Sequence, residues 1–411
     1  MSPARRSIEE RLAAAGLSPL PRTAWAEIDL DALAGNLAVL RELAGPGTPV
    51  HPVVKADAYG HGAIPVALAL QDAGADGFCV ATLDEALALR AAGIERPILV
   101  LYPIPAGLAG AAAAARIAVT GGDDDMLDAL LSGLRDAGPA APLDVHLEVE
   151  TGLGRGGFDL EHVVAAARAI TGAPGATLAG AWTHFQATDD GPRTGAQVTA
   201  FEGAMAALTE AGIPLPPRHV AASGGLLLDD VVSLDGVRPG LATYGLVPDE
   251  LLGDGLSAVE GAADLRPVLS LHARPVRVAD LPAAWGISYG PTFTTTRPSR
   301  IATLPLGYGD GWPRILSNRA DVLVRGHRVP LVGNVAMDAV MADVTDVPGA
   351  PVCVADEFVL LGSQGDERIT AAELAVAQGT NSWEVVTNLS ARLPRVYHAA
   401  SVPRSTRTLV D

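Results

Sequence analysis

The sequence contains little cysteine. Only two cysteines occur in 411 residues, Cys79 and Cys353, and each lies within an apolar run, FCVAT and VCVAD. Two distant thiols cannot form a disulfide framework, and their spacing does not match the clustered ligands of a structural zinc site. We therefore expect buried, unpaired thiols, no metal site and a location in the reducing cytoplasm.

Basic residues and long hydrophobic runs are also scarce. The chain has 29 Lys and Arg against 47 Asp and Glu, a net charge of −18, which disfavours binding to nucleic acid. The alanine-rich stretch at residues 106–119 is interrupted by Gly and Arg, so it predicts no membrane span. The first residues, MSPARRSIEERLAAAGL, lack the continuous apolar core of a secretion signal. We expect neither nucleic acid nor a membrane as a partner.

The chain does have the composition of a large globular protein, with 49% hydrophobic and 18% charged residues. From Trp25 to about Gly245, short β-branched runs alternate with helical patterns such as LDEALALRAAG and LEHVVAAARAI. The eight expected strands are AEIDL, HPVVKA, GFCVAT, PILVLY, ARIAVT, LDVHLEVE, AGAWTHF and RHVAAS. This alternation predicts an α/β fold with a (β/α)8 TIM-type barrel, in which the active-site residues lie where the strands end and the loops begin.

The sequence pattern changes after about residue 260. Runs such as RPVLSLHARPVRV, SRIATLPLGYG and ADVLVRGHRVPLVG are rich in β-forming residues broken by Gly and Pro, and ITAAELAVAQ is one of few helical patterns. We expect an N-terminal extension over residues 1–24, the barrel over 25–255 and a mostly antiparallel β domain over 256–411.

The run HPVVKADAYGHGA places Lys55 at the end of a hydrophobic strand. A strand-end lysine commonly extends its ammonium to solvent, so position alone does not assign it a role. A lysine held in an apolar barrel, however, has the environment that a Schiff-base lysine needs. The phenol of Tyr59 and the glycines at 60 and 62 would allow close approach to a phosphate.

The segment VVKADAYGHGA resembles the cofactor-lysine motif of the alanine racemase family. The similarity runs from about residue 24 to 400 and includes the change from barrel to β domain. The resemblance implies that Lys55 forms a Schiff base with pyridoxal 5'-phosphate and that Tyr59 holds the phosphate.

Three further barrel motifs match the family. In DGVRPGLATYG, the resemblance implies that Arg238 faces the pyridine nitrogen and that the backbone of Gly240 and Leu241 binds phosphate. WTHFQATDD supplies His184, which would link that arginine to the catalytic tyrosine, and HVAASGG supplies Ser223 for the phosphate. Outside these motifs, an arginine before a turn is usually a surface ion pair and a strand-end histidine a core residue.

The β domain contains a second signature, GISYGPTFTTTRPSRIATLPLGYGDGWPR. Tyr289 matches the family's second base, although a strand tyrosine taken alone is usually a core residue. Tyr308 and Arg314 match residues at the active-site entry, and the backbone of Met337 would contact the substrate carboxylate. The family builds each site from one subunit's barrel and the other's β domain, so the resemblance implies a functional homodimer.

The run TGLGRGG also matches a dinucleotide fingerprint, with Gly152, Gly154 and Gly157 between a strand and a helix. The next strand ends in His184 instead of an acid that could bind a ribose, which argues against NAD. In the family pattern this loop positions an arginine, here Arg155, near the cofactor and the substrate carboxylate.

Three positions depart from the family. Glu148 stands where a carbamylated lysine commonly precedes the arginine, and a glutamate carries the same charge without carbon dioxide. The alternative is a solvated strand glutamate. Ala391 in SARLPR replaces a tyrosine, and Asn334 replaces a common arginine, so the substrate range is expected to extend beyond alanine.

Taken together, the resemblance implies pyridoxal-phosphate-dependent racemisation of a free amino acid, L-alanine to D-alanine, by two bases. Lys55 would serve the D-enantiomer and Tyr289 the L-enantiomer from the opposite face. One alternative is a decarboxylase of the same fold, which usually has a glutamate at the ring nitrogen instead of Arg238. Another is a non-catalytic cofactor carrier, which has no need of a β domain with Tyr289.

Overall fold

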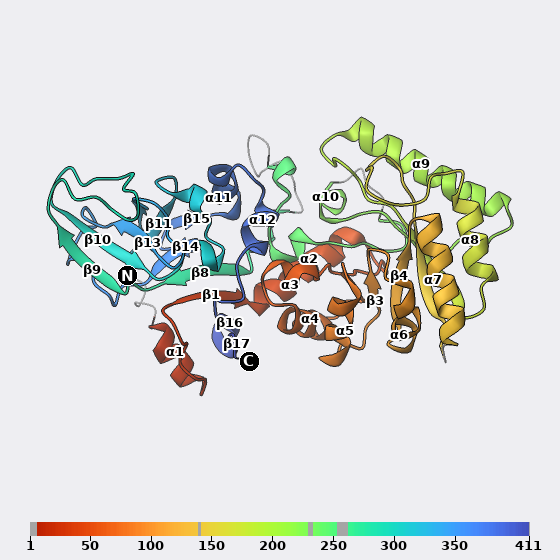
Figure 1. Cartoon of the computed structure of the whole chain (residues 1–411), viewed down its shortest axis with the longest axis horizontal. Helices are drawn as coiled ribbons and strands as arrows, with labels where there is room; N and C mark the ends of the chain where they lie inside the picture. The colour runs from red at the N-terminus through yellow and green to blue at the C-terminus, as the bar shows by residue number, and fades with distance from the viewer. Residues whose placement is uncertain (1–5, 139–140, 229–232, 253–261, 411) are drawn as a thin grey trace. The chain divides into compact units, whose positions relative to one another are not determined.

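The computed structural model describes residues 6–138, 141–228, 233–252 and 262–410 (Figure 1). The chain divides into two compact units. One comprises residues 33–58 and 63–266, and the other comprises residues 1–32, 59–62 and 267–411. We call them the barrel unit and the β unit and describe each by itself.

The barrel unit is built on a parallel sheet in the order β2-β3-β4-β5-β6-β7. Isolated parallel bridges join Val53 to β2 and Val50 to Val237, and the Arg238 amide donates a 2.9 Å hydrogen bond to the Ala221 carbonyl. These links add segments 50–53 and 237–239 to the six strands and close the ring. The predicted barrel is confirmed. The strands are β2 Phe78–Val80, β3 Ile98–Val100, β4 Ile117–Gly121, β5 Leu143–Glu148, β6 Ala176–Trp182 and β7 Arg218–His219.

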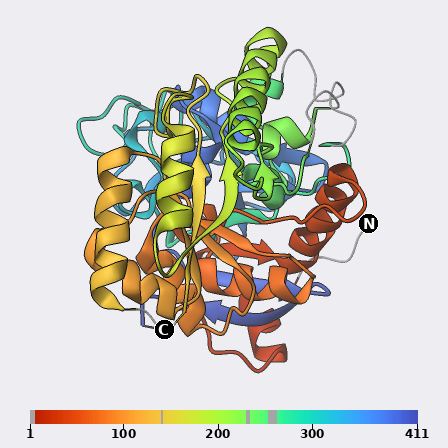
Figure 2. The ribbon, with the colours of Figure 1, turned by 90° about the vertical axis from the view of Figure 1, so that its right-hand side faces the viewer.

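Helices cover the outside of these strands. Helix α7 contacts β4, α8 contacts β5 and β6, and α9 packs on α8. Figure 2 shows these helices in colours from orange to green. Their ends follow from the sequence: Asp123 caps α7 by accepting from the Met126 amide, and Gly138 ends it with a left-handed φ of 56°. The helices are α2 Leu30–Ala44, α4 Ala63–Asp72, α5 Leu83–Ala91, η1 Ala106–Leu108, α6 Ala109–Ala114, α7 Asp124–Ala137, α8 Val163–Gly172, α9 Gly191–Glu210, α10 Ser223–Leu226, η2 Leu241–Tyr244 and η3 Asp249–Leu251.

The β unit contains a sheet in the order β12-β11-β14-β8-β1-β16-β17, with β15 paired to β14, and a smaller sheet β13-β10-β9. All these pairings are antiparallel except β1 with β16, so the predicted mostly antiparallel domain is confirmed. The strands are β1 Ala24–Asp29, β8 Leu269–Ala273, β9 Arg277–Leu281, β10 Ser299–Leu304, β11 Asp321–Val324, β12 His327–Pro330, β13 Val340–Asp343, β14 Phe358–Gln364, β15 Glu367–Ile369, β16 Arg395–Ala399 and β17 Val402–Arg407. Its helices are α1 Ile8–Ala14, η6 Tyr308–Asp310, η7 Arg314–Leu316, α11 Ala371–Gln378 and α12 Ser382–Thr387.

The first strand differs from the sequence-based expectation. The AEIDL run forms most of β1, but β1 pairs with β8 and β16 of the β unit and not with a barrel strand. Residues 50–53 therefore form the first barrel segment, and residues 237–239 form the last. The run is buried on both faces, a pattern shared by barrel strands and central sheet strands, so its sequence could not identify its neighbours.

In the part of the chain that the structure describes, no helix is both long and apolar enough to cross a lipid bilayer.

Candidate functional site

Lys55 follows the first barrel segment and is partly buried. Burial lowers the pKa of its ammonium from the ordinary value, and the nearby charge of Arg155 lowers it further, while Glu85 acts in the opposite direction. A lysine in this environment gives up its proton more readily and becomes a nucleophile. Lys55 is also the only lysine in the 411 residues, so arginine carries every other long-chain positive charge.

The backbone directly after Lys55 is left-handed. Ala56, Asp57, Ala58 and Tyr59 have φ angles of 51°, 56°, 54° and 53°. Left-handed helical geometry costs an L-residue about 1–2 kcal/mol, and such strain concentrates at functional sites. Two carboxylates hold this turn within the barrel unit: Glu85 accepts from the Ala56 amide at 2.6 Å, and Asp57 accepts from the Ala63 amide at 2.9 Å.

Two loops, one containing Ser223 and the other Gly240, are joined by hydrogen bonds. The Ser223 hydroxyl accepts hydrogen bonds from the backbone amides of Gly240 and Ala242, at 2.9 and 3.1 Å. A Cβ on Gly224 would lie 2.3 Å from the Thr188 hydroxyl, so this loop must carry glycine. The buried Thr188 hydroxyl has no hydrogen-bond partner among the described residues. Hydroxyls and backbone amides gathered at glycines form a suitable cradle for a phosphate.

Arg238 is fully buried in the barrel and is held by backbone and histidine contacts. Its guanidinium donates to the His219 ring and carbonyl and to the Thr183 carbonyl at 2.8 Å, and it lies 4.9 Å from the centre of the Trp182 ring. Burial lowers the pKa of Arg238 to about 10. The group remains cationic at neutral pH.

His184 lies at the end of β6, where its carbonyl accepts from the Gln197 amide at 3.1 Å. Burial lowers the pKa of its imidazole to about 3, and the charges of Arg238, Arg155 and Lys55 contribute. His184 is therefore neutral at physiological pH.

Glu148 and Arg155 do not form an ion pair among the described contacts, although each affects the electrostatics of the site. Burial raises the pKa of Glu148 to about 7, and the charges of Arg155 and Arg238 only partly oppose this shift. The guanidinium of Arg155 lies 5.7 Å from the centre of the Tyr102 ring. The predicted replacement of a carbamylated lysine by Glu148 stays a prediction.

In the glycine-rich loop after β5, a carboxylate of the loop itself accepts hydrogen bonds from the backbone amides. Glu150 accepts from the amides of Gly152 at 2.5 Å, Gly154 at 2.8 Å and Arg155 at 3.3 Å. A dinucleotide loop must offer such amides to a pyrophosphate. The arrangement therefore favours a loop that presents Arg155 over one that binds NAD.

In the β unit, several expected site residues point to solvent. Tyr289 is 79% exposed, Met337 52% and Tyr308 45%. The Asn334 amide donates to the carbonyls of Tyr289 and Gly290, at 2.8 and 3.0 Å, and thereby holds the turn that carries the phenol. If Tyr289 serves as a base, as the resemblance implies, it needs a covering surface, because water would otherwise compete for its proton.

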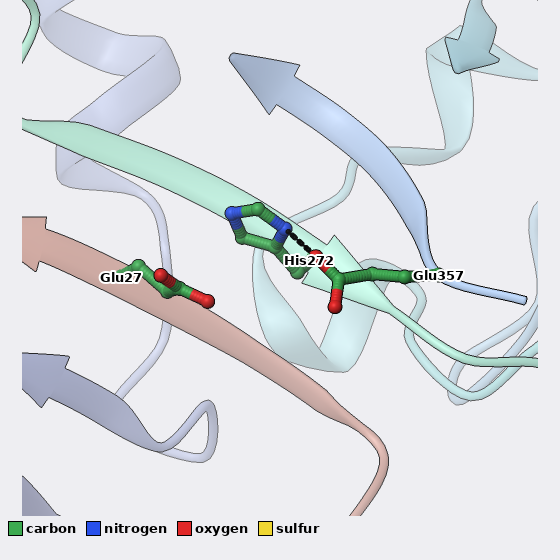
Figure 3. Close-up of side chains that lie close together, drawn as sticks. All are labelled: Glu27, His272 and Glu357. Carbon is green, nitrogen blue, oxygen red and sulfur yellow. Dashed lines mark hydrogen bonds and ion pairs between the residues drawn. The ribbon is translucent and has the colours of Figure 1, made fainter. Parts of the chain in front are cut away.

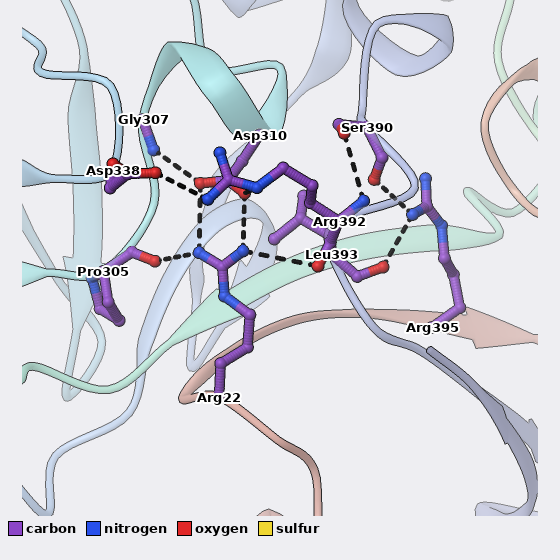
Figure 4. Close-up of polar contacts among 9 residues, drawn as sticks. All are labelled: Arg22, Pro305, Gly307, Asp310, Asp338, Ser390, Arg392, Leu393 and Arg395. Atoms are coloured by element: carbon purple, nitrogen blue, oxygen red, sulfur yellow. Dashed lines mark hydrogen bonds and ion pairs between the residues drawn. The ribbon is translucent and has the colours of Figure 1, made fainter. Parts of the chain in front are cut away.

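A buried carboxylate organises the segment next to Tyr308. In Figure 4, Asp310 accepts from Arg22 at 2.6 and 3.1 Å and from the Gly307 amide at 3.1 Å. Arg392 extends past it to Asp338 at 2.7 Å. The Gly307 turn is close-packed, since a Cβ there would lie 2.0 Å from the Ala336 carbonyl oxygen. These contacts fix the positions of Tyr308 and of the segment that includes Met337, and Arg314 begins η7 nearby in sequence.

One group among the described residues has the composition of a metal site: Glu27, His272 and Glu357 (Figure 3). Its atoms already have partners. The Arg11 guanidinium donates to Glu27 at 2.6 and 3.1 Å, and His272 bonds to Glu357 at 2.9 Å and to the Ser270 hydroxyl at 2.7 Å. This network joins α1, β1 and β8 within the β unit and explains the carboxylates without a cation.

The barrel unit thus brings together most of the predicted barrel residues. They are Lys55, Glu148, Arg155, His184, Ser223, Arg238, Gly240 and Leu241. Tyr59, Tyr289, Tyr308, Arg314 and Met337 belong to the β unit.

Sequence reasoning missed three groups, His219, Thr188 and Glu85. A signal existed for His219, which sits in the predicted strand RHVAAS, but the other two depend on tertiary contacts.

Comparisons with known proteins match both units. The family model "Alanine racemase, N-terminal domain" matches residues 28–248, and "Alanine racemase, C-terminal domain" matches residues 268–397. An alanine racemase of Symbiobacterium thermophilum is 42% identical over 378 residues, which cover 92% of this chain and 97% of that protein. An alanine racemase of Desulfovibrio desulfuricans is 40% identical over 378 residues, covering 92% and 98%.

Solved structures agree. The alanine racemase from Bacillus anthracis with bound L-Ala-P matches with a TM-score of 0.88 and 33% identity, over 96% of this chain and 99% of that one. The alanine racemase from Streptomyces coelicolor matches with a TM-score of 0.83 and 39% identity, over 91% and 98%.

Proposed function

The chain belongs to the alanine racemase family, and from this membership we propose that it interconverts L-alanine and D-alanine with pyridoxal 5'-phosphate as cofactor. The observation that carries the proposal is the position of Lys55. It is the sole lysine of the chain, its pKa is lowered by burial, and it shares one unit with Arg238 and the Ser223 loop.

The residues present fit the cofactor. Ser223, the backbone of Gly240 and Leu241, and Tyr59 would hold its phosphate, in agreement with the unpartnered Thr188 hydroxyl and the required glycine beside it. Lys55 would carry the covalent link, and Arg238 would hold the ring. Bound pyridoxal 5'-phosphate supplies an electron-withdrawing system that acidifies the α-hydrogen of an amino acid.

The chain's own residues would move the proton. Lys55 Nζ, whose pKa burial lowers, would take or return it on one side, and the Tyr289 hydroxyl would act on the other. Inversion requires two such groups on opposite faces. Arg238 stays cationic and disfavours protonation of a neighbouring ring nitrogen, which limits side reactions that need a stronger electron sink. A decarboxylase of this fold usually has a glutamate at this position.

We propose that the working form is a cytoplasmic homodimer in which the β unit of one subunit completes the barrel site of the other. The exposure of Tyr289, Met337 and Trp285, at 79%, 52% and 51%, supports this because a partner would cover these side chains. Cys79 is buried as expected, whereas Cys353 is exposed, contrary to the expectation. Both thiols are free, which suits a reducing compartment, and D-alanine supply would be the corresponding role.

Two measurements test the function. Chiral chromatography of L-alanine incubated with the purified protein should show D-alanine accumulating to equal amounts. Borohydride reduction should fix the cofactor on a single peptide containing residue 55, because the only other aliphatic amine is the chain terminus. Lys55→Arg keeps the charge but cannot form the link, so it should abolish both results. Turnover by Lys55→Arg at the wild-type rate would refute the proposal.

A further inference from the structure

The barrel contains a cavity at the end opposite to Lys55 and Ser223. Its volume is about 760 Å³. Its walls come from the amino-terminal parts of the parallel strands and the segments before them, including Ile98 at the start of β3 and Asp144 in β5. Barrel enzymes carry out their chemistry at the carboxyl ends of the strands, so this cavity is not the racemase site.

Arg238 lines the cavity and has no ion-pair partner there, and the charge of Glu148 offsets it only in part. Arg238 is 3% exposed, and its guanidinium bonds only to neutral groups, the His219 ring and two carbonyls. No carboxylate of the described residues lies within ion-pair distance of it. A buried cation is costly unless an anion offsets it, so the part of the cavity next to Arg238 favours a negative ligand group.

Two neutral histidines form a chain of hydrogen bonds from Arg238 to the cavity. Arg238 donates to His219 Nδ1, so the single hydrogen of this neutral ring resides on Nε2. His219 Nε2 then donates to His146 Nδ1 at 2.9 Å, which places the hydrogen of His146 on its own Nε2. Burial lowers the pKa of His146 to about 3 and that of His219 well below its ordinary value, so both rings stay neutral and the chain keeps this direction. His146 lines the cavity and offers it an N–H donor.

The remaining wall is largely apolar. Leu99, Ala118, Ala179, Leu215 and several prolines line it. Two of the other charged groups, Arg218 and Asp235, neutralise each other at 2.8 Å. Asp144 is exposed and would repel a second negative charge on a ligand. His51, partly buried, completes the polar side.

We propose that this cavity is a second ligand site, which binds a compact monocarboxylate with an apolar body. The carboxylate accepts from His146 Nε2 and offsets the charge of Arg238, while the body packs against Leu99, Ala118 and Ala179. A neutral molecule of the same shape cannot offset the charge of Arg238. The second carboxylate of a dicarboxylate would be repelled by Asp144.

The test uses 4-fluorobenzoate as the probe and ¹⁹F NMR as the readout. The holoenzyme is kept in saturating alanine, so that the substrate carboxylate site is occupied. We expect 4-fluorobenzoate to bind at least about tenfold more tightly than 4-fluorobenzyl alcohol, since a charge-assisted hydrogen bond contributes that much. No detectable binding at millimolar concentration, or equal binding of the alcohol, overturns the proposal.

Two variants locate the probe. His146→Phe keeps a ring but removes the donor, and Ala118→Leu leaves the histidine chain intact and fills the cavity. Each should weaken 4-fluorobenzoate binding about tenfold, whereas His162→Gln, at an exposed histidine outside the barrel interior, should not. If His146→Phe unfolds, Ala118→Leu decides alone. Unchanged affinity in Ala118→Leu places the probe elsewhere and overturns the proposal.

Discussion

The side-chain amide of Asn334 donates to the backbone carbonyls of Tyr289 and Gly290, at 2.8 and 3.0 Å, and the Ser288 hydroxyl donates back to the Asn334 carbonyl at 2.6 Å. Ser288 has a φ of 64°, and Gly290 has a φ of 49°. The turn that presents the Tyr289 phenol is therefore in a left-handed conformation at both neighbours of the tyrosine, and Asn334 supports it.

Asn334→Ala removes both hydrogen bonds to this turn and should lower kcat/KM for alanine about tenfold, because small displacements of Tyr289, the proposed second base, would be costly. The fall should be equal in the two directions, since the equilibrium between enantiomers is fixed. With α-deuterated L-alanine the primary isotope effect should increase, because Tyr289 is the base proposed to act on that enantiomer. Asn388→Ala, at an exposed asparagine that bonds locally to Glu384, is the control. Equal kinetics in Asn334→Ala and Asn388→Ala would show that the turn keeps its conformation without the Asn334 hydrogen bonds.

Lys55→Ala and Tyr289→Phe subunits should complement one another. Each homodimer is nearly inactive, but a hybrid carries one site with both residues intact. Statistical exchange of equal amounts should restore about a quarter of the wild-type activity. The measurement is turnover after mild dissociation and reassociation, with heterodimers quantified by mass spectrometry. Absent recovery in a sample that contains heterodimers would contradict the shared site.

Glu148→Gln should have opposite effects on activity and stability. Activity should fall because the carboxylate that influences Arg155 is lost. The pKa of Glu148 is raised to about 7 from 4.5, so the folded state binds the proton more tightly and loses stability as pH rises from about 4.5 to 7. The neutral amide avoids this loss, which is at most about 3 kcal/mol.

Urea unfolding at pH 5 and pH 8 checks this expectation. Glu148→Gln should match the wild type at pH 5 to within a small offset and exceed it at pH 8. The activity should be insensitive to bicarbonate, because a glutamate needs no bound carbon dioxide. The structure already excludes a solvated strand glutamate, because Glu148 is buried. Full activity in Glu148→Gln, with the same pH profile of stability as the wild type, would show that this buried residue does not assist Arg155.

Ala391→Tyr should narrow the substrate range. Ala391 is exposed in the β unit and stands where the family commonly has a tyrosine, so the unmodified enzyme should also racemise serine or a longer amino acid. Hydrophobic pockets discriminate by only about 1–3 kcal/mol per methylene or hydroxyl, so the ratio of kcat/KM for alanine to that for serine should rise about tenfold in the variant. A chiral assay over a panel of L-amino acids measures this ratio. A wild-type enzyme restricted to alanine would show that another residue fills the space.

The amino-acid sequence by itself determined most of the helices and strands and the polar side chains at the strand ends. Alternating β-branched and helical runs specify strands and helices locally, and Lys55, His184 and Arg238 fall at or just after strand ends because their motifs do. A single lysine among many arginines indicates that only this position needs a cation that can lose its proton.

Tertiary structure decided which strands are neighbours and which polar groups meet. The run at β1 is compatible with either unit, and only pairing with β8 and β16 places it in the β unit. The left-handed turn after Lys55 consists mainly of ordinary residues that do not favour it, so contacts such as that with Glu85 must impose it. The hydrogen-bonded chain from Arg238 through His219 to His146 joins three separate barrel segments, and His146 lies 73 residues from His219 in the sequence. Hydrogen bonds between distant segments leave no local pattern, since they depend on how the barrel closes.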